Sequence, residues 1–283
     1  MNPKRPIMRY HGGKWMLAPW ICSYLPAHRT YVEPFCGAAS VLMRKPRSAM
    51  EVINDRNGRL VSALRVIRDR EGARELARLL SLTPYAKTEF EAASETADDP
   101  IEDARRLLVL AGQGHSGTGA TGLGGPRRTG WRRGDRGTQS TSARDWAGLP
   151  DHVQSWCDRL CGVYIENAEA LEVIERYDRP DALFYVDPPY LHSTRGKKRA
   201  YHYEMTDDQH RALAERLRRT VGVVVISGYP SALYDRELYA DWQRVERPVW
   251  TGRGTSACEV IWISPNARPA DLPLFAVHGT RAA

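Results

Sequence analysis

An acid, two prolines and a tyrosine follow an apolar run in the segment FYVDPPY, residues 184–190. Pro188 and Pro189 fix their own φ angles and bias the preceding residue away from helix, so we expect a rigid, extended corner. A carboxylate oxygen of Asp187 and the carbonyl of Pro188 can then accept both hydrogens of one NH2 group. Tyr190 offers a flat face for stacking a ring. The segment suits an exocyclic amine on an aromatic base, and a structural turn is the alternative.

Two further segments place small or acidic residues at the ends of predicted strands. TYVEPFCGAAS (30–40) predicts a buried strand over 31–35 that ends in a small-residue turn at Gly37, and EVINDRNG (51–58) predicts a strand that ends at Asp55. Ligands of open parallel sheets collect beyond the carboxyl ends of the strands, where an acid often binds ribose hydroxyls. The turn lacks G-x-G-x-x-G, so a nucleoside is favoured over a dinucleotide. The alternative is that Gly37 makes a turn and Asp55 caps a helix.

The N-terminal segment YHGGK, residues 10–14, holds an aromatic and a cation close together through two glycines. A phosphate-binding loop requires Ser or Thr after the lysine, but Trp15 follows Lys14, so that interpretation fails. The functional interpretation is that Tyr10 and Lys14 reach over a bound ligand. A plain N-terminal turn is the alternative.

The elements that must position these residues alternate between strand and helix. After the first two strands, apolar spacing predicts a helix near residues 58–69, and later apolar runs predict strands at 163–167, 183–187 and 221–230. Thr206 and Gln209 form a capping box at the start of another helix. The tail predicts two strands that pair as an antiparallel hairpin. This pattern predicts an α/β fold with a mostly parallel, doubly wound sheet.

The middle of the chain breaks this alternation. Residues 70–111 predict helices over 73–80 and 84–93, and a long one that begins at Pro100. Residues 112–142 are rich in glycine and arginine and lack apolar periodicity, which predicts a long loop or a loose hairpin.

Two basic stretches lie near these features. Residues 126–137 surround a tryptophan with arginines, which suits phosphate binding and a wedge or stack at a base step; a solvated loop is the alternative. Residues 194–204 follow the DPPY corner directly and could order over DNA. The candidate DNA-binding residues are Arg127, Arg128, Trp131, Arg132, Arg133, Arg195, Lys197, Lys198 and Arg199.

The bulk composition agrees with a polyanionic partner but does not require one. The chain has 283 residues and a net charge of +7, with 42% hydrophobic residues, enough for a sizeable core. Five scattered cysteines include one close pair, Cys157 and Cys161, with no second ligand pair, so no metal site is expected. No apolar run approaches the length of a membrane span, and we expect a cytoplasmic protein.

The blocks YHGGK, YVEPFCGAAS, VINDRN and FYVDPPY, in this order, resemble the alpha group of DNA adenine-N6 methyltransferases, which includes Dam-type and phage or prophage enzymes. The resemblance covers the layout of residues 8–265. It implies a Rossmann-like, S-adenosylmethionine-dependent methyltransferase fold with an antiparallel C-terminal strand. It also implies a catalytic domain formed by residues 1–69 and 151–283, and a helical and loop target-recognition insert over 70–150 that binds double-stranded DNA.

The resemblance also implies roles for individual residues. Asp55 would bind the ribose hydroxyls of the cofactor, and Asp187 would lie between the methyl donor and the target amine. One departure is that this chain has Ala38 and Ala39 where family members often have a second glycine. The residues implied at the cofactor are Tyr10, Lys14, Pro34, Phe35, Cys36, Gly37, Asp55 and Asp187.

The expected reaction is methyl transfer to adenine N6 after the base flips out of the duplex, with Asp187, Pro188, Pro189 and Tyr190 at the catalytic corner. Alternatives keep the cofactor but change the acceptor to cytosine N4, an RNA base or a protein glutamine amide. At the position of Asp187, enzymes that methylate glutamine tend to carry Asn and enzymes that methylate cytosine N4 tend to carry Ser, so the Asp favours adenine. A DNA-binding module without catalysis is a further alternative. The target sequence is open, as is pairing with a cognate restriction nuclease.

Overall fold

Strands and helices alternate over most of the chain in the computed structural model, which describes residues 3–115, 130–133, 141–194, 203–250 and 256–267. The strands are β1 (Thr30–Glu33), β2 (Met50–Asn54), β3 (Tyr164–Glu166), β4 (Ala182–Val186), β5 (Val223–Gly228), β6 (Gln243–Trp250) and β7 (Ser256–Ile263). The longer helices are α3 (Gly58–Arg68), α4 (Arg70–Leu82), α6 (Pro100–Gln113), α8 (Pro150–Leu160), α9 (Ala170–Tyr177) and α10 (Asp207–Arg218). Shorter ones are α1 (Ala18–Cys22), α2 (Ser40–Arg44), α5 (Lys87–Ala92), α7 (Ser142–Ala147), η2 (His192–Thr194) and η3 (Leu233–Leu238).

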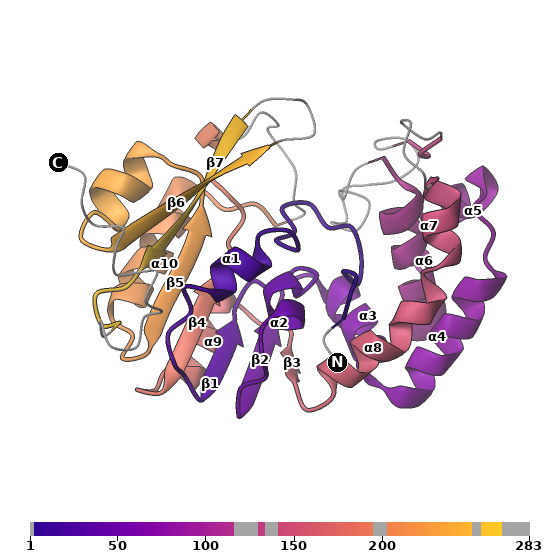
Figure 1. Cartoon of the computed structure of the whole chain (residues 1–283), viewed down its shortest axis with the longest axis horizontal. Coiled ribbons are helices and arrows are strands. Elements are labelled where there is room, and N and C mark those ends of the chain that lie inside the picture. The colour runs from indigo at the N-terminus through magenta and orange to yellow at the C-terminus, as the bar shows by residue number, and fades with distance from the viewer. Residues whose placement is uncertain (1–2, 116–129, 134–140, 195–202, 251–255, 268–283) are drawn as a thin grey trace.

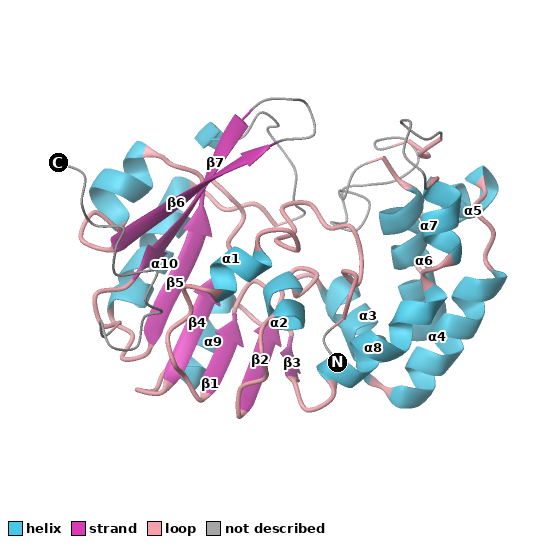
Figure 2. Ribbon diagram, viewed as in Figure 1, coloured by secondary structure: helices cyan, strands magenta, loops and turns pink. Residues whose placement is uncertain are grey.

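The strands form one sheet in the order β3-β2-β1-β4-β5-β7-β6 (Figures 1 and 2). The first five strands in this order are parallel to one another. Strand β7 runs antiparallel to both β5 and β6. This confirms the predicted Rossmann-like α/β fold with an antiparallel C-terminal strand. The strand order reverses between β1 and β4, so the crevice in which such sheets bind ligands lies at the ends of these two strands.

Alternating residues of the central strands bury opposite faces of the sheet. Tyr31 and Leu183 face α1, α2 and α3, whereas Val32, Val52 and Phe184 face α9 and α10. Each of these side chains is fully buried, and burial of one large apolar side chain stabilises the fold by about 1.5–3 kcal/mol. Both faces are therefore covered, which explains the continuous apolar runs in the sequence.

Two predicted element boundaries shift for identifiable reasons. The first strand was predicted to reach residue 35 but ends at Glu33, because β1 pairs on both sides and Pro34 has no N–H for a central strand. The second helix of the middle region was predicted from Pro84 but begins at Lys87. The carbonyl of Pro84 instead accepts a hydrogen bond from Gln113 Nε2 at 3.0 Å. In contrast, the capping box at Thr206 and Gln209 is confirmed at the start of α10.

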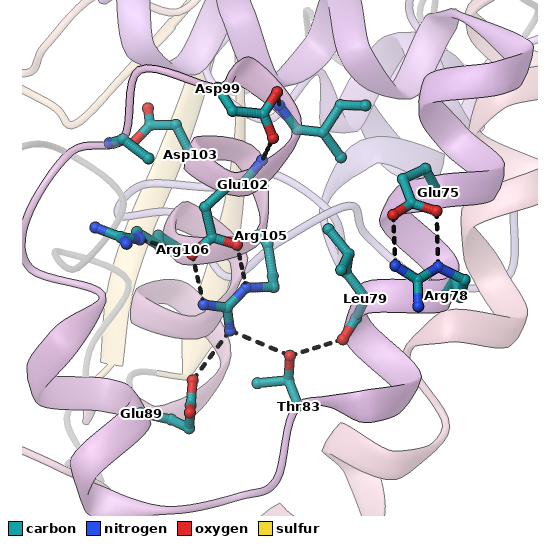
Figure 3. Close-up of polar contacts among 12 residues, drawn as sticks. Glu75, Arg78, Leu79, Thr83, Glu89, Asp99, Glu102, Asp103, Arg105 and Arg106 are labelled. Atoms are coloured by element: carbon teal, nitrogen blue, oxygen red, sulfur yellow. Dashed lines mark hydrogen bonds and ion pairs between the residues drawn. The ribbon is translucent and has the colours of Figure 1, made fainter.

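Helices α4 to α8 gather beside the β3 edge of the sheet (Figure 1). Among them, α4 packs against α6 and α8, and α3 packs against all three. An ion-pair cluster strengthens the group: the Arg105 guanidinium lies 2.6 Å from a Glu102 oxygen and 3.0 Å from Glu89, and it donates to Thr83 Oγ1 at 3.1 Å (Figure 3). Because α8 belongs to this layer by packing, the helical layer extends past the predicted insert boundary at residue 150.

The described residues at the end of α6 contact residues 131 and 132. Gly114 forms a bridge with Trp131, and Arg132 N donates to Gln113 O at 2.8 Å. Thr141 caps α7, so a helix begins inside the stretch that we predicted as a loop. No described helix is long and apolar enough to cross a bilayer.

Candidate active site

One cavity of about 200 Å³ lies at the switch point of the sheet and is bordered by segments far apart in sequence. The turn after β1, the end of β2, the corner after β4 and the N-terminal YHGGK segment all contribute to its wall. Every residue predicted for the cofactor borders it: Tyr10, Lys14, Pro34, Phe35, Cys36, Gly37, Asp55 and Asp187. The structure therefore brings these predicted residues together.

The turn after β1 depends on close backbone approach. Gly37 has φ +49°, and a Cβ built on it would lie 3.0 Å from Cε1 of Tyr10, so the Tyr10 ring covers the turn only because residue 37 is glycine. Ala39 also has a positive φ of 52° and is the only non-glycine residue to do so in the described parts of the chain. A left-handed alanine costs roughly 1 kcal/mol or more. The departure from the family's glycine pattern thus falls where the backbone would favour glycine.

Asn54 and Asp55 hold the neighbouring turns in place. The Asn54 amide donates to Pro34 O at 2.9 Å and to Ala168 O at 3.1 Å, which joins the turn after β1 to the segment after β3. Gly37 N donates to Asp55 Oδ2 at 3.0 Å, and Asn57 N donates to Asp55 Oδ1 at 2.9 Å. The Asn57 side chain, not Asp55, caps α3. The helix-cap alternative for Asp55 is therefore wrong.

Burial governs the charge of two acids at this edge. Burial raises the pKa of Asp55, and hydrogen bonds from the backbone of Asn57 and Gly37 oppose the rise. Burial raises the pKa of Glu33, at the end of β1, to about 7. Glu33 Oε1 accepts from Tyr31 Oη at 2.7 Å and from Leu42 N. Each carboxylate oxygen of Asp55 still has a lone pair for a ligand hydroxyl.

The Asp187 carboxylate is held from two sides. Ser227 Oγ donates to Asp187 Oδ1 at 2.8 Å, and Lys14 Nζ lies 2.9 Å from Asp187 Oδ2. The Tyr185 hydroxyl lies 3.1 Å from Ser227 Oγ and extends the chain of polar groups into the sheet. The DPPY corner thus places a carboxylate, held by Ser227 and Lys14, at the cavity wall.

Tyr190 is more enclosed than the sequence suggested. Its side chain is 7% exposed, and the Lys14 ammonium lies 4.7 Å from its ring centroid. Its ring meets Tyr229 edge to face, and its hydroxyl donates to Glu259. Burial raises the pKa of Glu259. The Lys14 ammonium therefore lies over the ring face that the sequence predicts as the stacking face for a target base.

Three residues of this network were missed as site residues: Asn54, Ser227 and Glu259. Each is a polar residue inside or at the end of an apolar strand, and all three are at most 3% exposed. A buried polar residue requires a hydrogen-bond partner. A polar residue in an apolar strand could therefore have been recognised from the sequence as part of a polar network. The identities of their partners depend on the strand order and could not be obtained from the sequence.

The predicted DNA-binding residues are only partly described. Trp131 packs against Tyr85, with ring centroids 5.5 Å apart, and donates to Gln113 Oε1. Arg132 borders a second cavity, of about 450 Å³, together with Lys4, Arg5 and Arg9; its Nη1 atom is buried without a hydrogen-bond partner. Arg133 is exposed. The other predicted residues lie outside the described parts of the chain: Arg127, Arg128, Arg195, Lys197, Lys198 and Arg199.

The seven-stranded sheet of the described residues, mostly parallel with antiparallel C-terminal strands, has a Rossmann-like methyltransferase fold, and the cavity and Asp187 lie at its switch point. Residues 10–251 match the family model of the D12 class N6 adenine-specific DNA methyltransferases. The chain belongs to this family. It is 27% identical over 252 residues to a DNA adenine methylase of Salmonella typhi, with 84% of this chain and 85% of the relative covered. A DNA adenine methylase of Escherichia coli (strain K12) is 30% identical over 124 residues, which is 41% of this chain and 44% of the relative.

Proposed function

We propose that the protein methylates adenine N6 in double-stranded DNA at the DPPY corner, with S-adenosylmethionine bound in the adjoining cavity. The observation that carries this proposal is the shared wall: Asp187, Gly37 and Asp55 border one cavity at the switch point. Adenine N6 transfer is the activity of the family, and a methyltransferase of this family implies S-adenosylmethionine as donor. The roles of individual residues are our proposal.

The cavity wall fits the parts of the cofactor. The absence of a side chain at Gly37 lets the Tyr10 ring pack over the turn at the cavity wall, since a Cβ there would strike the ring. Asp55, at the adjacent strand end, can accept from ribose hydroxyls. Phe35, Leu171 and Met205 give the cavity an apolar part that suits a nucleobase. When bound, S-adenosylmethionine supplies an electrophilic methyl group on a positively charged sulfur.

Asp187 and the Pro188 carbonyl can make the N6 amine of adenine a better nucleophile. The N6 lone pair is delocalised into the ring, so the amine is a poor nucleophile. Hydrogen bonds from N6–H to two fixed acceptors favour a more tetrahedral nitrogen and stabilise the positive charge that develops on it. A hydrogen bond from Ser227 already orients the Asp187 carboxylate. The target base must leave the duplex to reach it, and Tyr190 provides its stacking face.

The first prediction tests this role of Asp187. Replacement by alanine removes the acceptor, and we expect transfer of labelled methyl from S-adenosylmethionine to DNA to fall at least about a thousandfold, with DNA affinity kept within a few-fold. The matched control is Asp181→Ala. It removes an acid that directly precedes the same strand at its opposite end and pairs with Arg29 on the surface. Near wild-type transfer by Asp187→Ala would contradict the proposed mechanism.

A further inference from the structure

Lys14 occupies the place that the proposed reaction assigns to the target amine. Its Nζ lies 2.9 Å from Asp187 Oδ2 and 4.7 Å from the ring centroid of Tyr190. These are the hydrogen-bond acceptor and the stacking face that a flipped adenine requires. The Lys14 side chain is only 5% exposed. Adenine binding at the corner therefore requires this ammonium to shift, and a buried ammonium separated from its carboxylate is costly unless another anion receives it.

Glu259 is placed to receive it. This residue lies in the middle of β7, 245 positions from Lys14 in sequence, and is 3% exposed. Its Oε1 atom lies 3.7 Å from Lys14 Nζ. A charge-assisted hydrogen bond is about 2.8 Å long, so a shift of roughly 1 Å would bring the ammonium into direct contact. The Tyr190 hydroxyl donates to the same oxygen, which fixes the glutamate beside the stacking face.

We propose that Glu259 is a positioning residue that takes over the Lys14 ammonium when the target amine replaces it at Asp187. This inference rests on the proposed function. With Asp187 and Glu259 ionised, the Lys14 ammonium, which also donates to Gly12 O at 2.8 Å, faces two carboxylates. The positive charge that develops on N6 then pairs with Asp187, while Lys14 pairs with Glu259, so each charge has its own partner at the moment of transfer.

A double-mutant cycle on the rate tests the exchange. Glu259→Gln keeps an oxygen for the Tyr190 hydroxyl but removes the charge. We expect it to slow single-turnover methyl transfer to DNA about ten- to a hundredfold, with the dissociation constant of S-adenosylmethionine changed less than about threefold. Lys14→Gln also lowers the rate, but adding Glu259→Gln to it lowers the rate less than about threefold further, because no ammonium remains to be moved. If Glu259→Gln lowered the rate by the same factor in the wild type and in Lys14→Gln, the proposed transfer of Lys14 from Asp187 to Glu259 would be overturned.

A second cycle needs no catalysis and separates this inference from the proposed function. Asp187→Asn and Glu259→Gln each leave Lys14 one carboxylate, so each alone should lower the melting temperature only slightly. The double variant leaves the buried ammonium without either carboxylate. We expect its melting temperature to fall by about 3 °C or more beyond the sum of the two single decreases. Additive losses would refute the exchange even if the wild-type protein methylates adenine. A wild-type protein that transfers no methyl group but shows the excess loss would refute the proposed function alone.

Discussion

Two acids beside the DPPY corner and its cavity, Glu33 and Glu259, have pKa shifts opposite to that of Glu102 in the helical layer. At the sheet edge, burial raises the pKa of Glu33 to about 7 and also raises that of Glu259. In the helical layer, hydrogen bonds from the Arg105 side chain, followed by those from Arg106, lower the pKa of Glu102 to about 2 (Figure 3). Burial is thus the main cause of the pKa shifts of Glu33 and Glu259, whereas the shift of Glu102 comes mainly from hydrogen bonds with arginines. Glu51 of β2, which is paired with Arg159 and Lys45, also has a lowered pKa.

The two acids with raised pKa values lie beside the corner at which we propose that methyl transfer takes place. Acids with raised pKa values near a cavity are typical of functional sites, because burial keeps them responsive to a ligand's charge. Acids paired with arginine are already neutralised and mainly fix the orientation of helices. The following four predictions test the contrast, from the largest expected effect to the smallest.

Glu33→Gln should change how stability depends on pH. The raised pKa means that the folded protein keeps the Glu33 proton up to about pH 7, whereas the unfolded chain releases it near pH 4.5. The contribution of Glu33 therefore favours folding at low pH and is lost as the pH rises through this range. We expect the free energy of unfolding of the wild type, relative to Glu33→Gln, to fall by about 3 kcal/mol between these pH values.

Denaturant unfolding at several pH values measures this difference, and glutamine keeps an oxygen for both bonds made by Tyr31 and Leu42. The control is Glu71→Gln, an exposed acid in the first turn of α4. A pH-independent difference for Glu33→Gln would mean that this acid is already ionised in the folded protein.

Asp55→Asn should weaken cofactor binding without abolishing the fold. Loss of a charged acceptor for ribose hydroxyls costs about 2 kcal/mol, so we expect the dissociation constant of S-adenosylmethionine to rise about 30-fold in calorimetric titration. Asp69→Asn, which alters an acid that caps α4 outside the cavity, should leave the constant unchanged. Unaltered affinity in Asp55→Asn would assign Asp55 only to holding the Gly37 turn.

Glu102→Gln should show the pH dependence opposite to that of Glu33. Its lowered pKa means that the pairing with arginine is fully present above about pH 4.5 and is lost as the pH falls towards 2. Because the side chain is partly solvated, we expect only about 1 kcal/mol of destabilisation at pH 7, and less at pH 3. Glu75→Gln, which breaks an exposed pair with Arg78, is the control. If Glu102→Gln destabilised the protein more at pH 3 than at pH 7, the lowered pKa assigned to Glu102 would be wrong.

Arg132→Ala should have the smallest effect, on the salt dependence of DNA binding. Its unpartnered Nη1 beside a cavity bordered by Lys4 and Arg5 suits a phosphate. We expect the slope of log affinity against log salt to decrease by about one, equally on all sequences. Arg74→Ala, at an exposed position of α4, is the control. An unchanged slope for Arg132→Ala would remove this residue from the DNA interface.

The sequence predicted the strand ends more successfully than the contacts between them. Apolar runs that stop at Asp55 and Asp187 identified both strand ends, and the Thr206 capping box identified the start of α10. These signals are local. The pairing of Lys14 with Glu259 requires β7 to lie between β5 and β6 in the sheet, and no local pattern specifies that order. The proposed role of Glu259 as a partner of Lys14 therefore depends on the strand order and could not be predicted from the sequence.

The most direct test of the central claim is to sequence, with single-molecule detection of modified bases, DNA from cells that lack adenine methylation and express this protein. The account predicts N6-methyladenine in one fixed sequence context with the wild type and none with Asp187→Ala. N4-methylcytosine instead, or the same N6-methyladenine pattern with the Asp187 variant, would contradict it.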